Sequence, residues 1–384
     1  MTHHNFKGYF DYAAATPVDE NVLKAMQPFF YENFYNPSAI YLKSRAVRAI
    51  QEEARHTVAK CFGARSSEII FTAGGTEANN LAIRGIMNKH PEGNVVTSSI
   101  EHDSVLKTAQ NYSHRTASVS SKAVIDLSDL AKKIDDNTAL VSVMYANNEV
   151  GSIQPIKDIV TIISDIRQDR RQRNVSQPIY FHTDACQAVN YLDISVARLG
   201  VDLMTVNSGK IYGPKQVGAL YVKAGIVLEP IIYGGGQENG LRSGTENIAG
   251  VIGFSRALEK VCNKHKSEAK RLTDIRDFGI SKLTKKSASI TINGAKGLKR
   301  LANNIHLTVP GADNEYLMMQ LDEKGFQVAV GSACSASSDE PSHVLTAMGL
   351  TTEQAQSSLR ITMGRYSKKE DLDNLLDNLL NLIK

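Results

Sequence analysis

Short apolar runs alternate with stretches of helical periodicity over most of the first 250 residues. The apolar runs that predict β-strands are 67–72, 94–100, 139–145, 178–184 and 201–206. The run at 139–145 is nearly continuous in apolar residues, which is typical of a strand buried on both faces. Helical patterns follow the first run as far as Met87 and occupy 159–167. Strands that alternate with helices predict an α/β fold with a doubly wound, mostly parallel sheet.

The pattern changes in the last third of the chain. A long, heavily charged helical pattern covers 247–286, strand-like runs follow at 303–309 and 327–330, and a helical pattern closes the chain at 368–384. This order predicts a smaller C-terminal α+β domain beside the large one. We predict that residues 16–250 form the large domain, and that residues 1–15 together with 251–384 form the small one.

Composition and charge exclude several classes of protein. The chain is 42% hydrophobic and 22% charged, which excludes disordered, collagen-like and coiled-coil proteins. Its 44 Lys and Arg residues exceed its 40 Asp and Glu residues by only 4, too few to indicate nucleic-acid binding. No apolar run approaches the ~18 residues of a membrane span. The four cysteines lie far apart without a CxxC pair, so we expect a reducing, cytoplasmic location and no metal site. Together with the composition, this indicates a cytoplasmic enzyme.

A candidate phosphate site follows the first predicted strand. Gly74, Gly75 and Thr76 open a helix directly after it, so free backbone N–H groups and a hydroxyl converge at one point. The alternative is an ordinary strand-to-helix turn with Thr76 as the N-cap. The chain contains neither GxxxxGK[ST] nor a GxGxxG after a strand, which removes the P-loop and dinucleotide interpretations.

Two charged residues follow later strands. Asp184 ends the apolar run at 178–184, and Lys210 follows the run at 201–206 beside Gly209. A lysine at a buried strand end can lose its charge and become a nucleophilic amine, although an Asp184–Lys210 salt bridge is the simpler alternative. Pyridoxal phosphate requires a lysine for its Schiff base, an acid at its pyridinium nitrogen and a helix N-terminus for its phosphate. Together with His102, which can stack on the ring or move protons, these residues predict a pyridoxal-phosphate site.

Two further residues are candidates for contact with a substrate. Cys334 lies in a run of small residues without periodicity, 330–341, which predicts an accessible loop where a cysteine is placed for reactivity. Cys61 lies within an apolar helical pattern and reads as a small core residue. Arg360 lies within an apolar strand pattern; such an arginine clamps a carboxylate or forms an internal ion pair.

These motifs, in this order, resemble those of the cysteine desulfurases, which are fold-type I pyridoxal-phosphate enzymes of the class V aminotransferase group. The match runs almost from end to end, through segments 11–17, 36–38, 75–77, 101–102, 147–151, 184–187, 210–215, 234–238, 242–245 and 331–334. The resemblance implies a homodimer with active sites at the interface. It also implies removal of sulfur from L-cysteine, which gives L-alanine and an enzyme-bound persulfide.

The resemblance also implies residue roles. Lys210 would hold the cofactor as a Schiff base, Cys334 would attack the substrate sulfur, and His102 would stack on the ring and handle protons. The remaining cofactor contacts would come from Asp184 at the pyridine nitrogen, Gln187 and Asn148 near the ring oxygen, and Gly75, Thr76 and the partner subunit's Thr245 at the phosphate. The substrate carboxylate would be held by Arg360, Asn148 and Asn36.

One departure from the family concerns the phosphate. The family usually has Ser-x-His-Lys at the lysine, whereas this chain has Gly209 in place of the histidine. Ser208 or Asn207 can offer a replacement donor.

The expected function is a cysteine desulfurase that passes sulfur to an acceptor for iron–sulfur cluster assembly or tRNA thiolation. The alternatives are a selenocysteine lyase or another class V lyase, and a binding partner that has lost activity.

Overall fold

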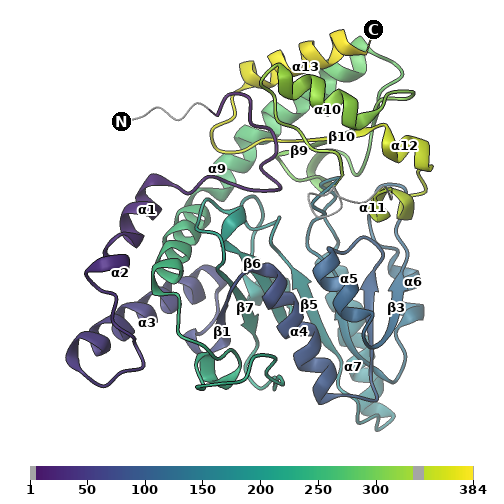
Figure 1. Cartoon of the computed structure of the whole chain (residues 1–384). Coiled ribbons are helices and arrows are strands. Elements are labelled where there is room, and N and C mark those ends of the chain that lie inside the picture. Colours follow the sequence, from purple (N-terminus) through teal and green to yellow (C-terminus); the bar gives the residue numbers. More distant parts are fainter. Residues whose placement is uncertain (1–5, 332–340, 384) are drawn as a thin grey trace.

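The computed structural model describes residues 6–331 and 341–383, and a seven-stranded sheet forms its centre (Figure 1). The strand order is β1-β7-β6-β5-β4-β2-β3. The strands are β1 (Ile69–Thr72), β2 (Asn94–Ser98), β3 (Ser113–Ala117), β4 (Thr138–Ser142), β5 (Tyr180–Asp184), β6 (Leu203–Asn207) and β7 (Gly218–Val222). Only β7 runs antiparallel to its neighbours, β1 and β6; the other pairs are parallel. The predicted mostly parallel sheet is therefore confirmed.

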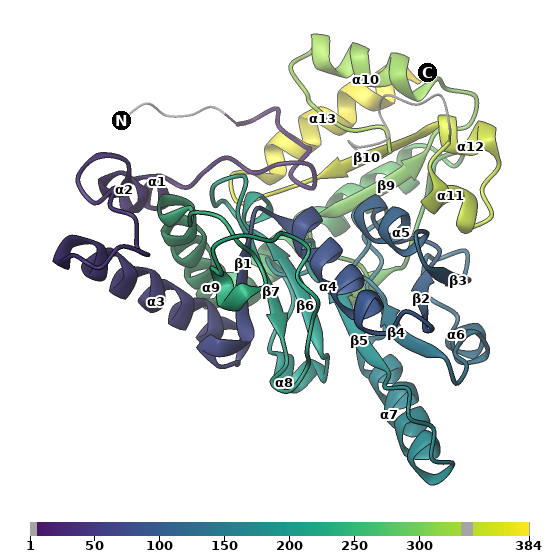
Figure 2. The same ribbon diagram turned by 60° about the horizontal axis from the view of Figure 1, so that its bottom comes forward.

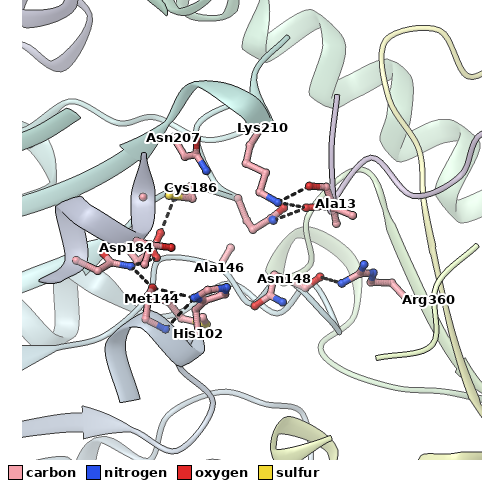
Figure 3. Close-up of a pocket in the computed structure, with 16 residues that line it drawn as sticks. Ala13, His102, Met144, Ala146, Asn148, Asp184, Cys186, Asn207, Lys210 and Arg360 are labelled. Carbon is pink, nitrogen blue, oxygen red and sulfur yellow. Dashed lines mark hydrogen bonds between the residues drawn. The ribbon is translucent and has the colours of Figure 1, made fainter. Parts of the chain in front are cut away.

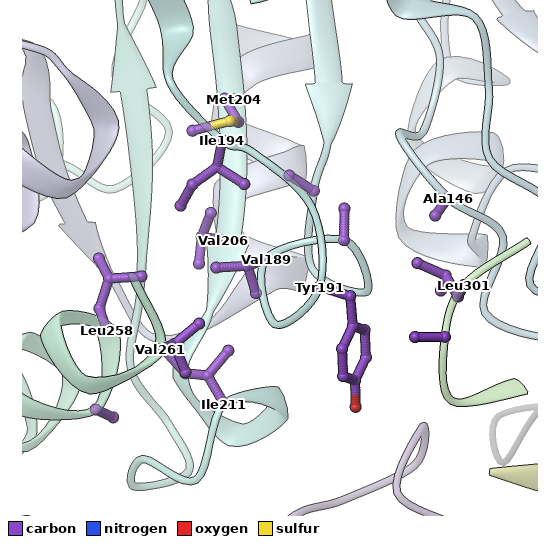
Figure 4. Close-up of a cluster of buried hydrophobic side chains, with 14 of the residues drawn as sticks. Ala146, Val189, Tyr191, Ile194, Met204, Val206, Ile211, Leu258, Val261 and Leu301 are labelled. Carbon is purple, nitrogen blue, oxygen red and sulfur yellow. The ribbon is translucent and has the colours of Figure 1, made fainter. Parts of the chain in front are cut away.

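Helices cover both faces of this sheet, and successive strand residues divide between two cores. Leu203 of β6 packs in a cluster with α4 (Gly75–Lys89) and α5 (Asp103–Ala109). Met204 packs in the opposite cluster with α3 (Leu42–Phe62), α7 (Ile156–Gln172) and α9 (Ile248–Lys286). Figure 4 shows part of that second core, which includes Met204 and Val206 of β6 and Leu258 and Val261 of α9. Strands buried on both faces explain the continuous apolar runs in the sequence.

The remaining helices of the large layer are short. They are α1 (Glu20–Met26), α2 (Pro28–Tyr31), α6 (Leu127–Lys133) and α8 (Val196–Leu199). Four 3₁₀ turns are also present in the described residues: η1 (Ser66–Glu68), η2 (Ser208–Lys210), η3 (Glu238–Gly240) and η4 (Gly297–Lys299). Among the described residues, no helix combines the length and apolar character that crossing a membrane would need.

A second, three-stranded antiparallel sheet lies near the C-terminus, with the order β10-β9-β8. Its strands are β8 (Thr291–Ile292), β9 (Asn304–Thr308) and β10 (Ser358–Thr362), and the helices around it are α10 (Asn314–Glu323), α11 (His343–Ala347), α12 (Thr352–Gln356) and α13 (Lys369–Leu382). The long helix α9 extends from the large sheet to this layer, as Figures 1 and 2 show. Gly279 permits its contact with α13, because a Cβ there would lie 2.8 Å from Cδ2 of Leu372.

Some predicted elements differ from the structure. The run at 327–330 is not a strand. Gln327 pairs with Tyr9 and Ala329 pairs with Arg360, each as an isolated bridge, and two single bridges to different segments do not form a ladder. The sequence interpretation missed β3, whose Ser-His-Arg-Thr-Ala run lies partly exposed at the sheet edge, and the short strand β7. The domain boundary at residue 250 stays a prediction, since α9 passes through it as one uninterrupted helix.

Candidate active site

Most of the polar residues singled out above lie at the carboxyl ends of β1, β2, β4, β5 and β6 or in the loops and helix starts that follow them. Because these strands run in the same direction, their carboxyl ends meet at one edge of the sheet. A cavity of about 230 Å³ opens there (Figure 3). The predicted site residues that line it are Gly75, Thr76, His102, Asn148, Asp184, Gln187, Asn207, Lys210 and Arg360.

Lys210 reaches this cavity from η2, directly after β6. Its Nζ donates to the carbonyl oxygens of Ala13 at 2.8 Å and Ala14 at 2.6 Å, a contact visible in Figure 3. Gln187 Nε2 also donates to the Ala13 carbonyl, at 3.0 Å. The N-terminal segment therefore forms one wall of the cavity and provides the acceptors that orient the lysine amine.

Asp184, the last residue of β5, is buried at the opposite side of the cavity. Its Oδ1 accepts from the backbone N–H of Cys186 at 2.9 Å, and its Oδ2 accepts from Asn79 Nδ2 at 2.7 Å. These two donors fix the plane of the carboxylate. Asn79 was not predicted from the sequence, although it lies four residues after Gly75 and hence on the same face of α4.

A hydrogen-bond chain links Asp184 to His102. Asn79 Nδ2 also donates to Ser104 Oγ at 2.8 Å, and Ser104 Oγ lies 2.8 Å from His102 Nδ1. His102 is the N-cap of α5, where its Nδ1 accepts the Ser104 backbone N–H at 3.0 Å. Because Nδ1 is an acceptor, a neutral imidazole in this position carries its proton on Nε2. Ser104, like Asn79, was missed by sequence reasoning.

Cys186 is a protonated thiol within the cavity wall. Burial, and next the Asp184 carboxylate, raise the pKa of Cys186 well above its ordinary value. Since the thiolate is the nucleophilic form of cysteine, Cys186 is not activated for attack. Cys61 on α3 and Cys262 on α9 do not line the cavity.

The start of α4 has the backbone geometry that suits an anion. Gly74 supplies no side-chain cap, and the first N–H groups of a helix have no partner within the helix. A second cavity of about 490 Å³ shares Gly75, Thr76, Asn207 and Lys210 with the first one. A Cβ on Gly75 would lie 3.0 Å from Cys186 Sγ and 3.4 Å from Asn207 Cβ. The start of α4 therefore approaches Cys186 and Asn207 as closely as a glycine permits.

Arg360 is buried in β10, where it forms the internal ion pair that was one of the two alternatives predicted for it. Its Nη2 donates to Asp11 Oδ1 at 2.8 Å, which forms an internal ion pair, and its Nη1 donates to the Asn148 carbonyl oxygen at 3.1 Å. It also lines the cavity, and its buried Nε has no hydrogen-bond partner. The guanidinium is therefore oriented by the protein and still faces the site.

Two predicted residues do not line the cavity of this chain. Asn36 and Thr245 are exposed and do not line it. Cys334 lies outside the residues that the structure describes.

The donor set fits pyridoxal phosphate. The cavity brings together a lysine amine, a buried carboxylate whose two oxygens are already oriented, and a helix N-terminus with a glycine cradle. These are the groups that the cofactor's aldehyde, ring nitrogen and phosphate need.

Comparison with known proteins agrees with this arrangement. The family model described as Aminotransferase class-V matches residues 8–375. The chain is 42% identical to the cysteine desulfurase IscS of Dictyoglomus turgidum, over 98% of this chain and 94% of that protein. It is 40% identical to the cysteine desulfurase IscS 1 of Archaeoglobus fulgidus, over 98% and 97%.

Solved structures agree as well. A structure titled NifS-like protein superposes with a TM-score of 0.88 at 32% identity, covering 97% of this chain and 98% of that one. A structure titled SspA in complex with cysteine superposes with a TM-score of 0.80 at 34% identity, covering 94% and 100%. The chain therefore belongs to the aminotransferase class-V family and, within it, to the cysteine desulfurases.

Proposed function

We propose that this protein is a pyridoxal-phosphate-dependent cysteine desulfurase. L-cysteine and the thiol of Cys334 react to give L-alanine and a persulfide on Cys334: the carbon–sulfur bond of the substrate breaks and a sulfur–sulfur bond forms. The observation that carries the proposal is the meeting of the Lys210 amine, the Asp184 carboxylate and the start of α4 around one cavity. The similarity to the cysteine desulfurases of D. turgidum and A. fulgidus favours this activity over a selenocysteine lyase.

Pyridoxal phosphate supplies, when bound, an aldehyde for an amine and an electron sink for the carbon attached to that amine. Lys210 would hold it covalently, and Asp184 would accept a hydrogen bond from its ring nitrogen. Gly75, Thr76 and Asn207 would bind its phosphate, and Gln187 with Asn148 would lie at its ring oxygen. The orientation of Asp184 by Asn79 and Cys186 supports its place in this set.

His102 would lie against the cofactor ring and move protons at Nε2. This assignment is supported by the bonds to Nδ1, because they make Nε2 the nitrogen that carries the proton of a neutral imidazole. Lys210, once released from the cofactor, would act as a second proton carrier, with the Ala13 and Ala14 carbonyls holding its amine in reach.

Arg360 would bind the substrate carboxylate. Its buried Nε and its position on the cavity wall support this role, because a charge-assisted hydrogen bond to a carboxylate is strong in a buried setting. Asp11 would keep the guanidinium in place, and Asn148 and Asn36 would complete the carboxylate site.

Cys334 would carry the sulfur to an acceptor protein for iron–sulfur cluster assembly or tRNA thiolation. The raised pKa of Cys186, caused first by burial and then by Asp184, argues against Cys186 as the nucleophile. Cys61, Cys186 and Cys262 are free thiols, which supports a reducing, cytoplasmic location.

We place the active site at the interface of a homodimer. Large apolar side chains are exposed along one stretch of chain, in α1, α2, the loop that joins α2 to α3 and the first residue of α3: Leu23, Phe30, Tyr31, Phe34, Ile40, Tyr41 and Leu42. Such a patch is typical of a protein–protein interface. A second copy would also explain why Asn36 and Thr245 are exposed here, since each would complete the other copy's site. Sedimentation should give a dimer for the native protein and a monomer for Ile40→Glu; a native monomer would contradict the interface.

The activity is tested with the purified holoenzyme, L-cysteine and a thiol reductant. Sulfide and alanine should appear in equal amounts. Cys334→Ser should still bind the cofactor but release no alanine, whereas Cys186→Ser should remain active. Alanine release by Cys334→Ser at the native rate, or a persulfide mapped to Cys186 by mass spectrometry, would contradict the assignment.

A further inference from the structure

Gly209 leaves space at the proposed phosphate site. It stands where the resemblance expects a phosphate-binding histidine, and no backbone conformation forces a glycine there, because its φ lies outside the left-handed range. A Cβ built on Gly209 would have its nearest neighbours at 3.7 Å, namely Asn207 Oδ1 and Lys215 Cγ. The missing histidine would therefore have pointed into a region that Lys215 borders.

Lys215 is held in this position by its loop rather than by its side chain. The backbone of the loop is fixed by bonds from Ser208 N to the Val217 carbonyl at 3.1 Å and from Tyr212 N to Thr16 Oγ1 at 2.8 Å. Gln216, the next residue, adopts a left-handed conformation with φ of 59°. The Lys215 side chain is exposed and forms no hydrogen bond or ion pair with any residue that the structure describes.

The balance of charge around the second cavity singles out Lys215. The charged residues that line it, among those described, are Glu77, Lys210 and Lys215. Arg242 Nε neutralises Glu77 through a bond of 2.9 Å, and the amine of Lys210 is committed to the cofactor aldehyde. Lys215 thus remains as a cation without a counter-ion beside a group that carries roughly two negative charges.

The other candidate donors replace the histidine only in part. Ser208 Oγ is buried without a partner, and Ser208 lines neither cavity. Asn207 lines both cavities, but its Oδ1 is used by the Gly209 N–H at 3.1 Å, which leaves only its neutral amide NH₂ for the phosphate.

We propose that Lys215 supplies the positive charge for the cofactor phosphate in place of the absent histidine. This inference rests on the proposed function, because it concerns the phosphate of the same cofactor. A lysine acts on phosphate as a point charge from a flexible stem, so it needs less exact geometry than an imidazole does. It would hold the cofactor while the Lys210 amine is displaced by substrate.

The test measures binding to the apoprotein of pyridoxal 5′-phosphate and of pyridoxal, which lacks the phosphate. Absorbance of the lysine adduct reports both, without turnover. Lys215→Gln should bind pyridoxal 5′-phosphate about tenfold more weakly and should bind pyridoxal as the native protein does. Lys215→Arg should retain native affinity, and Lys296→Gln, which removes an exposed lysine elsewhere, serves as the matched control.

A second variant tests whether the two positions share one role. Gly209→His in the Lys215→Gln background should restore most of the lost affinity for pyridoxal 5′-phosphate. The inference is overturned if Lys215→Gln binds it with native affinity, if both ligands lose affinity equally, or if Gly209→His restores nothing. Failure of the native protein to form any adduct at Lys210 would instead contradict the proposed function.

Discussion

At the scale of single residues, Asn79 is the side chain on which the geometry of the cavity depends. It is almost fully buried, and its Nδ2 donates both to Asp184 and to Ser104. Removing a donor from a buried carboxylate costs about 1–3 kcal/mol. We therefore infer that Asn79 positions both Asp184 and, through Ser104, His102 against the cofactor ring.

Asn79→Ala should lower kcat about tenfold and shift the pH at which the absorbance of the bound cofactor changes, because Asp184 would lose a donor. Spectrophotometric pH titration measures this shift, which a purely structural role for Asn79 would not produce. Asn80→Ala is the matched control, since among the residues that the structure describes the Asn80 side chain bonds only to the Thr76 carbonyl of its own helix. An unchanged titration in Asn79→Ala would refute the positioning role.

Glu101 makes the stability of the fold depend on pH. Burial first, and then the nearby Asp184 carboxylate, raise the pKa of Glu101 from 4.5 to about 8, against the opposing hydrogen bonds from Ser98 and Met144. The folded state therefore binds a proton more tightly than the unfolded chain. The resulting stabilisation is fully present below pH 4.5 and is lost as the pH rises towards 8.

The native protein should lose about 2 kcal/mol more unfolding free energy between pH 6 and pH 8.5 than Glu101→Gln does, because the amide cannot ionise. Urea unfolding of both proteins at the two pH values provides the measurement. Other titrating groups are common to both proteins and cancel in the difference. Parallel pH profiles would show that Glu101 is already ionised in the fold at pH 6.

At the scale of elements, the start of α4 is set by how closely it approaches the β5 and β6 loops. A Cβ on Gly75 would lie 3.0 Å from Cys186 Sγ, and Cys186 is itself buried. Gly75→Ala should therefore push the helix start away from the phosphate position and weaken cofactor binding about tenfold.

Cys186→Ala in the Gly75→Ala background should recover most of that affinity, since it removes the sulfur that the new methyl group would meet. Cofactor dissociation constants for the two single variants and the double variant complete the cycle. If the double variant binds no better than Gly75→Ala, crowding against Cys186 is not the cause of the loss.

At the scale of the whole molecule, the N-terminal segment connects the two sheets through the active site. It bridges to the small layer at Tyr9 and Asp11, supplies the Ala13 and Ala14 carbonyls to Lys210, and bonds to Gly209 through Thr16. Asp11 holds Arg360 from this segment. The position of the small layer relative to the cofactor site thus depends on residues near the start of the chain.

Asp11→Ala should raise KM for L-cysteine about tenfold without weakening cofactor binding, because Arg360 would lose the partner that orients its guanidinium. Steady-state kinetics and cofactor titration separate the two effects. Asp19→Ala is a suitable control: Asp19 belongs to the same segment but pairs with Arg365 and Lys260, so its loss should lower stability and leave KM unchanged. If Asp19→Ala raised KM and Asp11→Ala did not, Asp11 would not be the residue that orients Arg360 for the substrate.

The sequence alone determined the character of the large sheet and the chemistry of the site. Apolar runs such as 139–145 and 178–184 predicted buried parallel strands, because a strand covered on both faces needs no polar alternation. Lys210, Asp184 and Gly75 were found because each ends or follows such a run, and strand ends are where this fold binds ligands. The resemblance to the cysteine desulfurases depended on local motifs in order, which are likewise a property of the chain.

Only the tertiary structure decided what these residues contact. The antiparallel insertion of β7 between β1 and β6, the bond from Asn79 to Asp184 and the pairing of Arg360 with Asp11 each join segments distant in the chain. Periodicity reports which side of an element a residue occupies, but not which other element covers that side. Gly209 illustrates the division: the resemblance to the family indicated that a histidine is replaced there, and the fold placed Lys215 beside the space at Gly209.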